Sequence, residues 1–144
     1  MLNDASSVDE LKRVDHLIFV TLKYTRTVDI IRNVLVRLQA AMDSEIHDVL
    51  EWAYLEKKID KVPPAPLMRI NYMEKVFKDS KVKDITDFYM YLRNLANCEY
   101  KKKEEYRKNV AMVTKDDEIT IDKLKELADK TKKHIYYLKD LMKE

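Results

Sequence analysis

Apolar residues return at helical spacing in several separate stretches of the chain. Residues 28–53 place an apolar side chain every three or four positions, and residues 11–21 show the same pattern over a shorter length. Ser6 or Ser7 precedes Val-Asp-Glu, and acids favour the first turn of a helix, so we expect the first helix to begin there. Residues 23–27 contain two β-branched polar residues and predict a break. We expect two helices in this half, with one continuous helix as the alternative.

Proline marks the middle of the chain. Pro63 and Pro64 end the second helix, because proline lacks the N–H that a helix interior needs. Pro66 fits the first turn of a further helix, whose apolar face runs from Leu67 to Phe77.

A fourth helix is expected after a connector at residues 79–81. Asp84 or Thr86 begins this helix, and apolar residues between positions 85 and 96 form its inner face. The tail that follows, residues 100–108, is rich in Lys and Glu and is expected to be a solvated extension of the helix.

Two β-prone segments, residues 110–114 and 118–121, flank a Lys-Asp-Asp turn and are compatible with a small hairpin. Thr120 or Asp122 then opens the last helix, with an apolar stripe over residues 124–142. Together these patterns predict an all-α fold. It is an up-and-down bundle of four to five helices, with a small β-hairpin before the last helix as an open option.

The absence of glycine changes the picture more than any other feature of the composition. None of the 144 residues is Gly. Phosphate-cradling loops, dinucleotide fingerprints and tight turns with positive φ need glycine, so P-loop and Rossmann proteins are excluded. The length fits one helical-bundle domain over residues 1–144, with residues 1–6 as a flexible N-terminus. Hydrophobic residues make up 46% and charged residues 38%, which suits a packed core under a charged surface.

Charge and targeting signals place few further limits. The formal net charge is +2, which neither requires nor excludes a nucleic-acid partner. The abundance of Lys and Glu resembles the composition of thermophile proteins. A single Cys excludes an internal disulfide. The first residues do not resemble a secretory signal, and no apolar run is long enough to span a membrane. We therefore expect a cytoplasmic protein with no membrane partner and no cofactor.

Three histidines are candidate metal ligands or bases. His16, His47 and His134 lie on three different predicted helices. Neither Glu-x-x-His nor His-x-x-x-His occurs, although these spacings place two ligands on one helix face. We therefore predict no metal site and interpret all three as partly exposed or hydrogen-bonded surface histidines.

Cysteine and aromatic residues also have two interpretations. No neighbouring base activates Cys98, so a buried structural cysteine on a helix is the main interpretation and a nucleophile is the alternative. The aromatic residues can pack at the rim of the core, which is the main interpretation, or can stack on nucleic-acid bases. They are Trp52, Tyr54, Tyr89, Tyr91, Tyr100, Tyr106, Tyr136 and Tyr137.

A basic run interleaves cations with tyrosine within residues 100–108. Two glutamates dilute its charge, so a solvated face is the main interpretation and contact with phosphates is the alternative. The candidate phosphate contacts are Lys101, Lys102, Lys103, Arg107 and Lys108.

Two segments carry a family resemblance. Residues 36–50 begin VRLQAAM, end HDVL and lead towards the prolines, and residues 92–100 read LRNLANCEY. The first is similar to the second helix of small HEPN proteins (higher eukaryote and prokaryote nucleotide-binding domains) that are paired with minimal nucleotidyltransferases. The second is similar to the Arg-Asn-x-x-x-His-x-Tyr motif of the HEPN superfamily. The distance from Pro66 to Arg93 is also similar to that of the family, and with the last helix the resemblance covers most of the chain.

The resemblance implies a specific chemistry. In this family the arginine and histidine of the motif, contributed by both subunits of a dimer, hold the scissile RNA phosphate and activate the ribose 2′-hydroxyl. That reaction needs a group that titrates near neutrality, and here Cys98 stands where the histidine belongs. The matched motif residues are Arg93, Asn94, Cys98 and Tyr100, and a second placement on Arg107 and Asn109 also lacks a histidine.

We therefore expect a non-catalytic HEPN-like protein that binds RNA or a protein partner such as a minimal nucleotidyltransferase. We also expect a homodimer formed through the helices that carry residues 93–100, with Tyr91, Tyr100 and Tyr106 as candidate interface aromatics. A metal-independent ribonuclease that uses Arg93 or Arg107 with another base is one alternative. A helical scaffold with no nucleic-acid role is the other.

Overall fold

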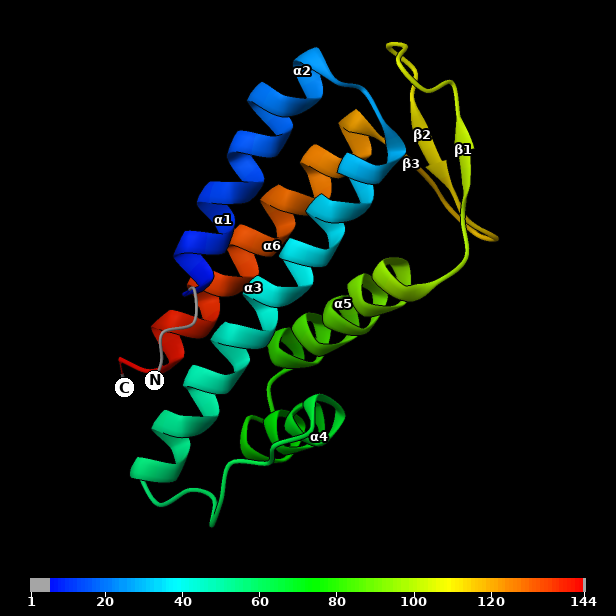
Figure 1. The fold of residues 1–144 in the computed structure, drawn as a ribbon. Helices are drawn as coiled ribbons and strands as arrows, with labels where there is room; N and C mark the ends of the chain where they lie inside the picture. Colours follow the sequence, from blue (N-terminus) through cyan, green and yellow to red (C-terminus); the bar gives the residue numbers. More distant parts are fainter. Residues whose placement is uncertain (1–5, 144) are drawn as a thin grey trace.

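The chain folds around one long central helix in the computed structural model, which describes residues 6–143 (Figure 1). This helix, α3, spans Val28–Leu55, and the helices that contact it most are α1, Ser7–His16; α5, Ser80–Asn97; and α6, Ile121–Leu141. Along the chain, α1, α3, α5 and α6 alternate in direction in Figure 1. The expected helical class is confirmed, whereas residues 1–5 of the expected flexible N-terminus lie outside the described residues.

The first helix begins and ends where the sequence predicts. Ser6 is the N-cap of α1, and its side chain accepts a backbone N–H of the first turn at 3.2 Å. The helix continues through a π-helical turn, η1, Leu17–Thr21, into α2, Leu22–Tyr24. Thr25 then leaves the helical region with φ −134° and ψ 90°, and Thr27 caps α3. The expected break is therefore confirmed, and two helices form rather than one.

The apolar stripe of α3 forms much of the core. Every residue of the predicted stripe is at most 2% exposed: Val28, Ile31, Leu35, Leu38, Met42, Ile46, Val49 and Ala53. The carboxylate of Glu45 is buried among them. Ser7 Oγ donates to Glu45 Oε1 at 2.7 Å, and Lys139 Nζ lies 2.8 Å from the same oxygen. Because a buried carboxylate needs such partners, Glu45 ties the start of α1 and the end of α6 to α3.

Two shorter segments follow the proline break. Helix α4, Pro66–Val76, begins at the proline expected in its first turn. Helix α5 starts earlier than predicted, because the Asp79 side chain caps it and accepts a backbone N–H at 2.7 Å. The expected start at Asp84 or Thr86 is wrong, since Val82 is already fully buried in the first turn.

Three short strands follow α5 and precede α6 in the sequence, and they form a small antiparallel sheet. Its strands are β1, Lys101–Lys103; β2, Ala111–Val113; and β3, Glu118–Thr120, in the order β1-β2-β3. The two later strands are the predicted hairpin, and buried Met112 lies opposite buried Ile119.

Residues 100–108 are mostly exposed, as expected, but the expectation that they extend the helix is wrong. Helix α5 ends at Asn97, and Lys101–Lys103 pairs with β2 as the edge strand of the sheet. The three lysine side chains are exposed, and charged residues on an edge strand discourage pairing with other chains.

Helix α6 begins after the cap Thr120, one of its two predicted starts. The buried stripe follows the prediction as far as Leu138, and the last predicted positions, Leu141 and Met142, are half-buried: Leu124, Leu127, Ala128, Thr131, Ile135 and Leu138 are buried. Within residues 6–143, no helix is both long enough and apolar enough to cross a membrane.

Three residues within 6–143 adopt positive φ, although the chain has no glycine: Lys57 (62°), Glu104 (49°) and Tyr106 (69°). The expectation that such turns need glycine is therefore wrong here. A side chain with a Cβ costs about 1–3 kcal/mol in this region, so the surroundings must hold the backbone in place. Two of the three lie in the loop between β1 and β2.

Candidate functional site

Arg93 lies in a partly buried polar network between α5 and α3. Arg93 Nη1 donates to Tyr89 Oη at 3.3 Å, and Tyr89 Oη donates to Asp43 Oδ1 at 2.6 Å. Burial raises the pKa of Asp43, against the effects of the Tyr89 hydrogen bond and the charges of Arg69 and Arg93. Burial and the hydrogen bond to Asp43 likewise raise the pKa of Tyr89. Arg93 is thus held near a carboxylate, which competes with a phosphate for its charge.

The other residues of the motif point in different directions. Asn94 is exposed, and Tyr100 packs against the core. Cys98 lies in extended backbone just beyond α5, and its thiol donates to the Leu95 carbonyl at 3.6 Å. The expectation of a buried cysteine on a helix is wrong, because α5 ends at Asn97 and Cys98 is only half-buried.

His47 lies away from Arg93 along the helix pair. It follows Asp43 by one turn of α3, while Arg32, in the first half of α3, donates to the Ala96 carbonyl at 2.9 Å. The helices are therefore antiparallel, and Arg93 and His47 lie on opposite sides of the Asp43 contact.

His134 lies on a different side of α5. Its ring centroid is 5.1 Å from that of Phe88, which precedes Arg93 by five residues and so points about 140° away around the helix. Burial, and then the charge of Lys130, lower the pKa of His134 against the charge of Asp84. The Nε2 atom is buried and has no hydrogen-bond partner among the described residues.

His47 forms a compact group with two carboxylates. Its Nδ1 lies 3.4 Å from Glu51 Oε2 and 3.9 Å from Asp48 Oδ1, and one ligand-type atom from each of the three side chains lies within 4.8 Å of the others. The spacing His-x-x-x-Glu would have indicated this group, because residues four apart share a helix face. Both carboxylates are exposed and His47 is partly so, and we assign no metal to them.

The basic run divides into paired and unpaired cations. Lys102 Nζ lies 3.3 Å from Asp29 Oδ1, and Lys103 Nζ lies 3.1 Å from Glu118 Oε1. Among the described residues, the cations of this run without an ion pair are Lys101, Arg107 and Lys108. All three are exposed and can meet an anionic partner.

The alternative match to the Arg-Asn motif, at Arg107 and Asn109, lies in the loop between β1 and β2. Arg107 and Asn109 are both exposed there, and Arg107 N donates to the Glu104 carbonyl at 3.2 Å. The two side chains therefore lie in a loop rather than on a helix.

Two contacts dock this loop onto the start of α3. Tyr106 N donates to the Arg26 carbonyl at 2.7 Å. Val28 N, at the start of α3, donates to Glu105 Oε2 at 2.8 Å. Glu104 and Tyr106, the two residues of this loop with positive φ, flank Glu105, so these contacts hold the strained loop in place. Figure 1 shows the loop at the same end of the molecule as α2.

Exposed aromatic residues and cations gather at this end. Tyr24 is 80% exposed, Tyr106 74% and Phe19 58%. Lys23 and Arg26 flank Tyr24 in sequence, and neither forms an ion pair with another described residue. We call residues 23–26, residues 101–108 and Phe19 the basic–aromatic surface. Tyr24 was missed as a candidate, although Lys-Tyr-Thr-Arg has the same mixture of residues as the later run.

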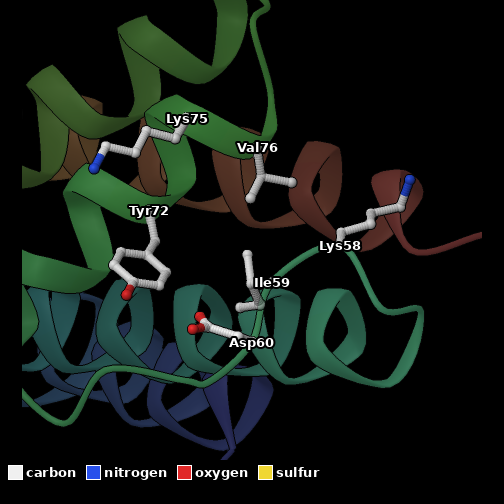
Figure 2. Close-up of a pocket in the computed structure, with 6 residues that line it drawn as sticks. All are labelled: Lys58, Ile59, Asp60, Tyr72, Lys75 and Val76. Atoms are coloured by element: carbon white, nitrogen blue, oxygen red, sulfur yellow. The ribbon is translucent and has the colours of Figure 1, made fainter.

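A pocket lies between the α3–α4 connection and α4. This pocket has a volume of about 610 Å³ and is lined in part by Lys58, Asp60, Tyr72 and Lys75. Figure 2 shows the Nζ ends of the two lysines pointing to opposite sides of the pocket. Lys58 Nζ lies 5.7 Å from the Trp52 ring centroid, and Lys75 Nζ lies 5.9 Å from that of Tyr72. The polar groups around this pocket do not converge on one point, as they do in pockets that bind small ligands.

Comparison with known proteins adds no relative: no family model, curated protein or solved structure matches the chain significantly.

Proposed function

We propose that this protein binds single-stranded RNA through the basic–aromatic surface. The observation that carries the proposal is the hydrogen bond from Tyr106 N to the Arg26 carbonyl, which brings two basic and aromatic segments together. Proteins that bind single strands combine cations along the backbone with aromatic rings on which bases stack. Tyr24 and Tyr106 supply exposed rings, and the unpaired cations around them supply the charge.

The strained loop supports the same proposal. Glu104 and Tyr106 both have positive φ, which is uncommon for residues other than glycine. Strain of this kind clusters at functional sites, where the fold holds a side chain in a required position. Here the position is that of Tyr106, whose ring remains in solvent while its backbone is bound to Arg26.

We propose binding rather than cleavage as the activity. Metal-free cleavage at a 2′-hydroxyl needs a base close to the group that clamps the phosphate. The Arg93 guanidinium contacts Tyr89 near Asp43. His47 lies on the far side of the Asp43 contact from Arg93, and His134 lies next to Phe88 on another face of α5. Arg107 lies on an exposed loop, where its guanidinium can contact a phosphate without a histidine nearby in sequence.

RNA binding is tested by fluorescence anisotropy with a labelled single-stranded oligonucleotide. Base stacking contributes about 1–3 kcal/mol per base, so Tyr24→Ala and Tyr106→Ala should each weaken binding by roughly 5- to 150-fold. Tyr106→Phe should retain affinity, because it keeps the ring. Tyr136→Ala is the control, since Tyr136 is also exposed (57%) but lies towards the other end of α6. Equal losses in all three alanine variants, or no RNA binding by the natural chain, would overturn the proposal.

The absence of cleavage is tested in the presence of EDTA. We expect the natural chain to leave single-stranded RNA and tRNA intact. Robust cleavage that disappears in Arg93→Ala, His47→Ala or His134→Ala would show that a composite active site exists and that binding alone is the wrong description.

Self-association remains a prediction. Of the three candidate interface aromatics, Tyr91 donates to Asp117 Oδ1 at 2.9 Å and Tyr100 packs on the core, so Tyr106 is the most exposed. Met90, one helical turn before Arg93, is 40% exposed and gives α5 an apolar contact for a second copy. Light scattering at micromolar concentration should find a dimer, and a monomer alone would contradict this. Co-purification with a minimal nucleotidyltransferase tests the other predicted partner.

A further inference from the structure

A pocket with an apolar floor opens beside the basic–aromatic surface. It has a volume of about 270 Å³ and lies between the η1–α2 segment and the start of α6. Ile18 and Leu22, which are 4% and 1% exposed, form the floor together with Ile121. Phe19 lines the pocket and is 58% exposed. An apolar floor beside an exposed ring suits one flat, partly apolar group such as a nucleobase.

Three cations surround this pocket. They are Lys23 and Arg26 from the α2 end and Lys125 from the first turns of α6. Lys125 Nζ lies 5.5 Å from the centroid of the Phe19 ring. No Asp or Glu lines the pocket, and none of the three cations forms an ion pair with any residue in the described part of the chain. The pocket in Figure 2 differs, because Asp60 lies within it.

The charge and size of the pocket limit its ligand. Drug-sized ligands occupy roughly 300–1,000 Å³, so this smaller pocket suits a single nucleotide rather than a longer segment. A phosphodiester inside a strand carries one negative charge, whereas a phosphomonoester carries about −1.5 to −2 near pH 7. Three cations with no carboxylate match the phosphomonoester better.

We propose that this pocket binds the phosphorylated end of an RNA strand, with the terminal phosphate among the cations and the terminal base against Phe19. The proposal rests on the proposed function, because Lys23, Arg26 and Phe19 belong to the basic–aromatic surface. Lys125 lies outside that surface, on α6, and so allows the two ideas to be tested separately.

The test compares three oligonucleotides of one sequence that carry a 5′-phosphate, a 3′-phosphate or no terminal phosphate. Fluorescence anisotropy should show one phosphorylated strand binding roughly tenfold more tightly than the unphosphorylated strand. In Lys125→Ala this preference should disappear, and the unphosphorylated strand should lose only the smaller affinity that removal of one nearby cation costs. Lys133→Ala is the control, because it removes an exposed lysine further along the same helix.

The outcomes separate the two proposals. Equal, tight binding of all three strands would overturn the terminal-phosphate pocket and leave RNA binding in place. A preference that survives in Lys125→Ala would place the phosphate elsewhere and would also overturn the pocket. No binding of any strand would overturn the proposed function, and the pocket with it.

Discussion

Replacing Glu105 by Ala tests whether the loop between β1 and β2 is held against α3. Val28 N donates to Glu105 Oε2 at 2.8 Å, and Val28 is fully buried at the first position of α3. A hydrogen bond to a charged acceptor contributes about 1.5–3 kcal/mol, and a negative charge at a helix N-terminus adds about 0.3–1 kcal/mol. The Glu105 side chain is 25% exposed, so water offsets part of this sum. We expect Glu105→Ala to lower the free energy of unfolding by about 2 kcal/mol.

Thermal denaturation measures this loss. For a domain of this length, 1 kcal/mol corresponds to roughly 4 °C in Tm, so Glu105→Ala should lower Tm by about 8 °C. Glu104→Ala is the matched control, because Glu104 is the exposed neighbour and its substitution removes the same charge. Its effect should stay within about 0.5 kcal/mol. Glu105→Gln should lose less than Glu105→Ala, since an amide oxygen can still accept the hydrogen bond.

RNA affinity gives a second readout, because Glu104→Ala and Glu105→Ala should change it in opposite directions. Removing a negative charge beside a basic surface strengthens phosphate binding on its own, so Glu104→Ala should bind RNA as tightly as the natural chain or more tightly. Glu105→Ala should bind more weakly, because it releases the loop that positions Tyr106. A Glu105→Ala variant that kept both its Tm and its RNA affinity would refute the role given to this contact.

Three further predictions concern buried or partly buried ionisable groups. Burial and then the hydrogen bond to Asp117 raise the pKa of Tyr91 to about 12. Ultraviolet titration should therefore show a tyrosine that ionises near that pH and is absent from Tyr91→Phe; an unchanged titration curve would contradict the contact. Burial lowers the pKa of His134 from 6.5, so the unfolded chain takes up its proton at higher pH than the native chain does. Urea midpoints should therefore fall as the pH drops below about 6.5, and less steeply in His134→Gln; equal slopes would count against this. Lys139→Met leaves the buried Glu45 carboxylate without its cation and should cost about 3 kcal/mol, whereas Lys132→Met, which breaks a partly exposed pair, should cost under about 1 kcal/mol in the same urea titration. Equal costs would contradict the role of burial.

Local signals in the sequence predicted most of the helices. Ser6 caps α1, and Pro66 begins α4, because each acts on the backbone within a few residues. The periodic stripes of α3 and α6 were also correct, since a core face recurs with the helical repeat. The start of α5 differs from the prediction, because Asp79 caps this helix although its sequence neighbours are typical of a connector.

Contacts between distant residues could not be predicted in this way. Strand β1 forms because Lys101–Lys103 pairs with β2 across a loop, while its own three lysines resemble a solvated tail. Glu105 and Val28 are 77 positions apart in the sequence, and no local pattern joins them. The same holds for Tyr89 and Asp43, which are 46 positions apart and decide the surroundings of Arg93. The sequence therefore identified Tyr106 and the cations of residues 101–108 as candidates, whereas it did not identify Tyr24 or the surface that the two segments form together.

Photo-cross-linking of the protein to a uridine-rich single-stranded RNA tests the central claim most directly. Mass spectrometry of the cross-linked peptides then locates the contact on the chain. We predict cross-links in two separate peptides, one containing Tyr24 and the other containing Tyr106, because the backbone hydrogen bond from Tyr106 to Arg26 brings these two segments together in the folded protein. Cross-links confined to another exposed tyrosine, such as Tyr54 or Tyr136, or no cross-links at all, would contradict the claim that this end of the molecule binds RNA.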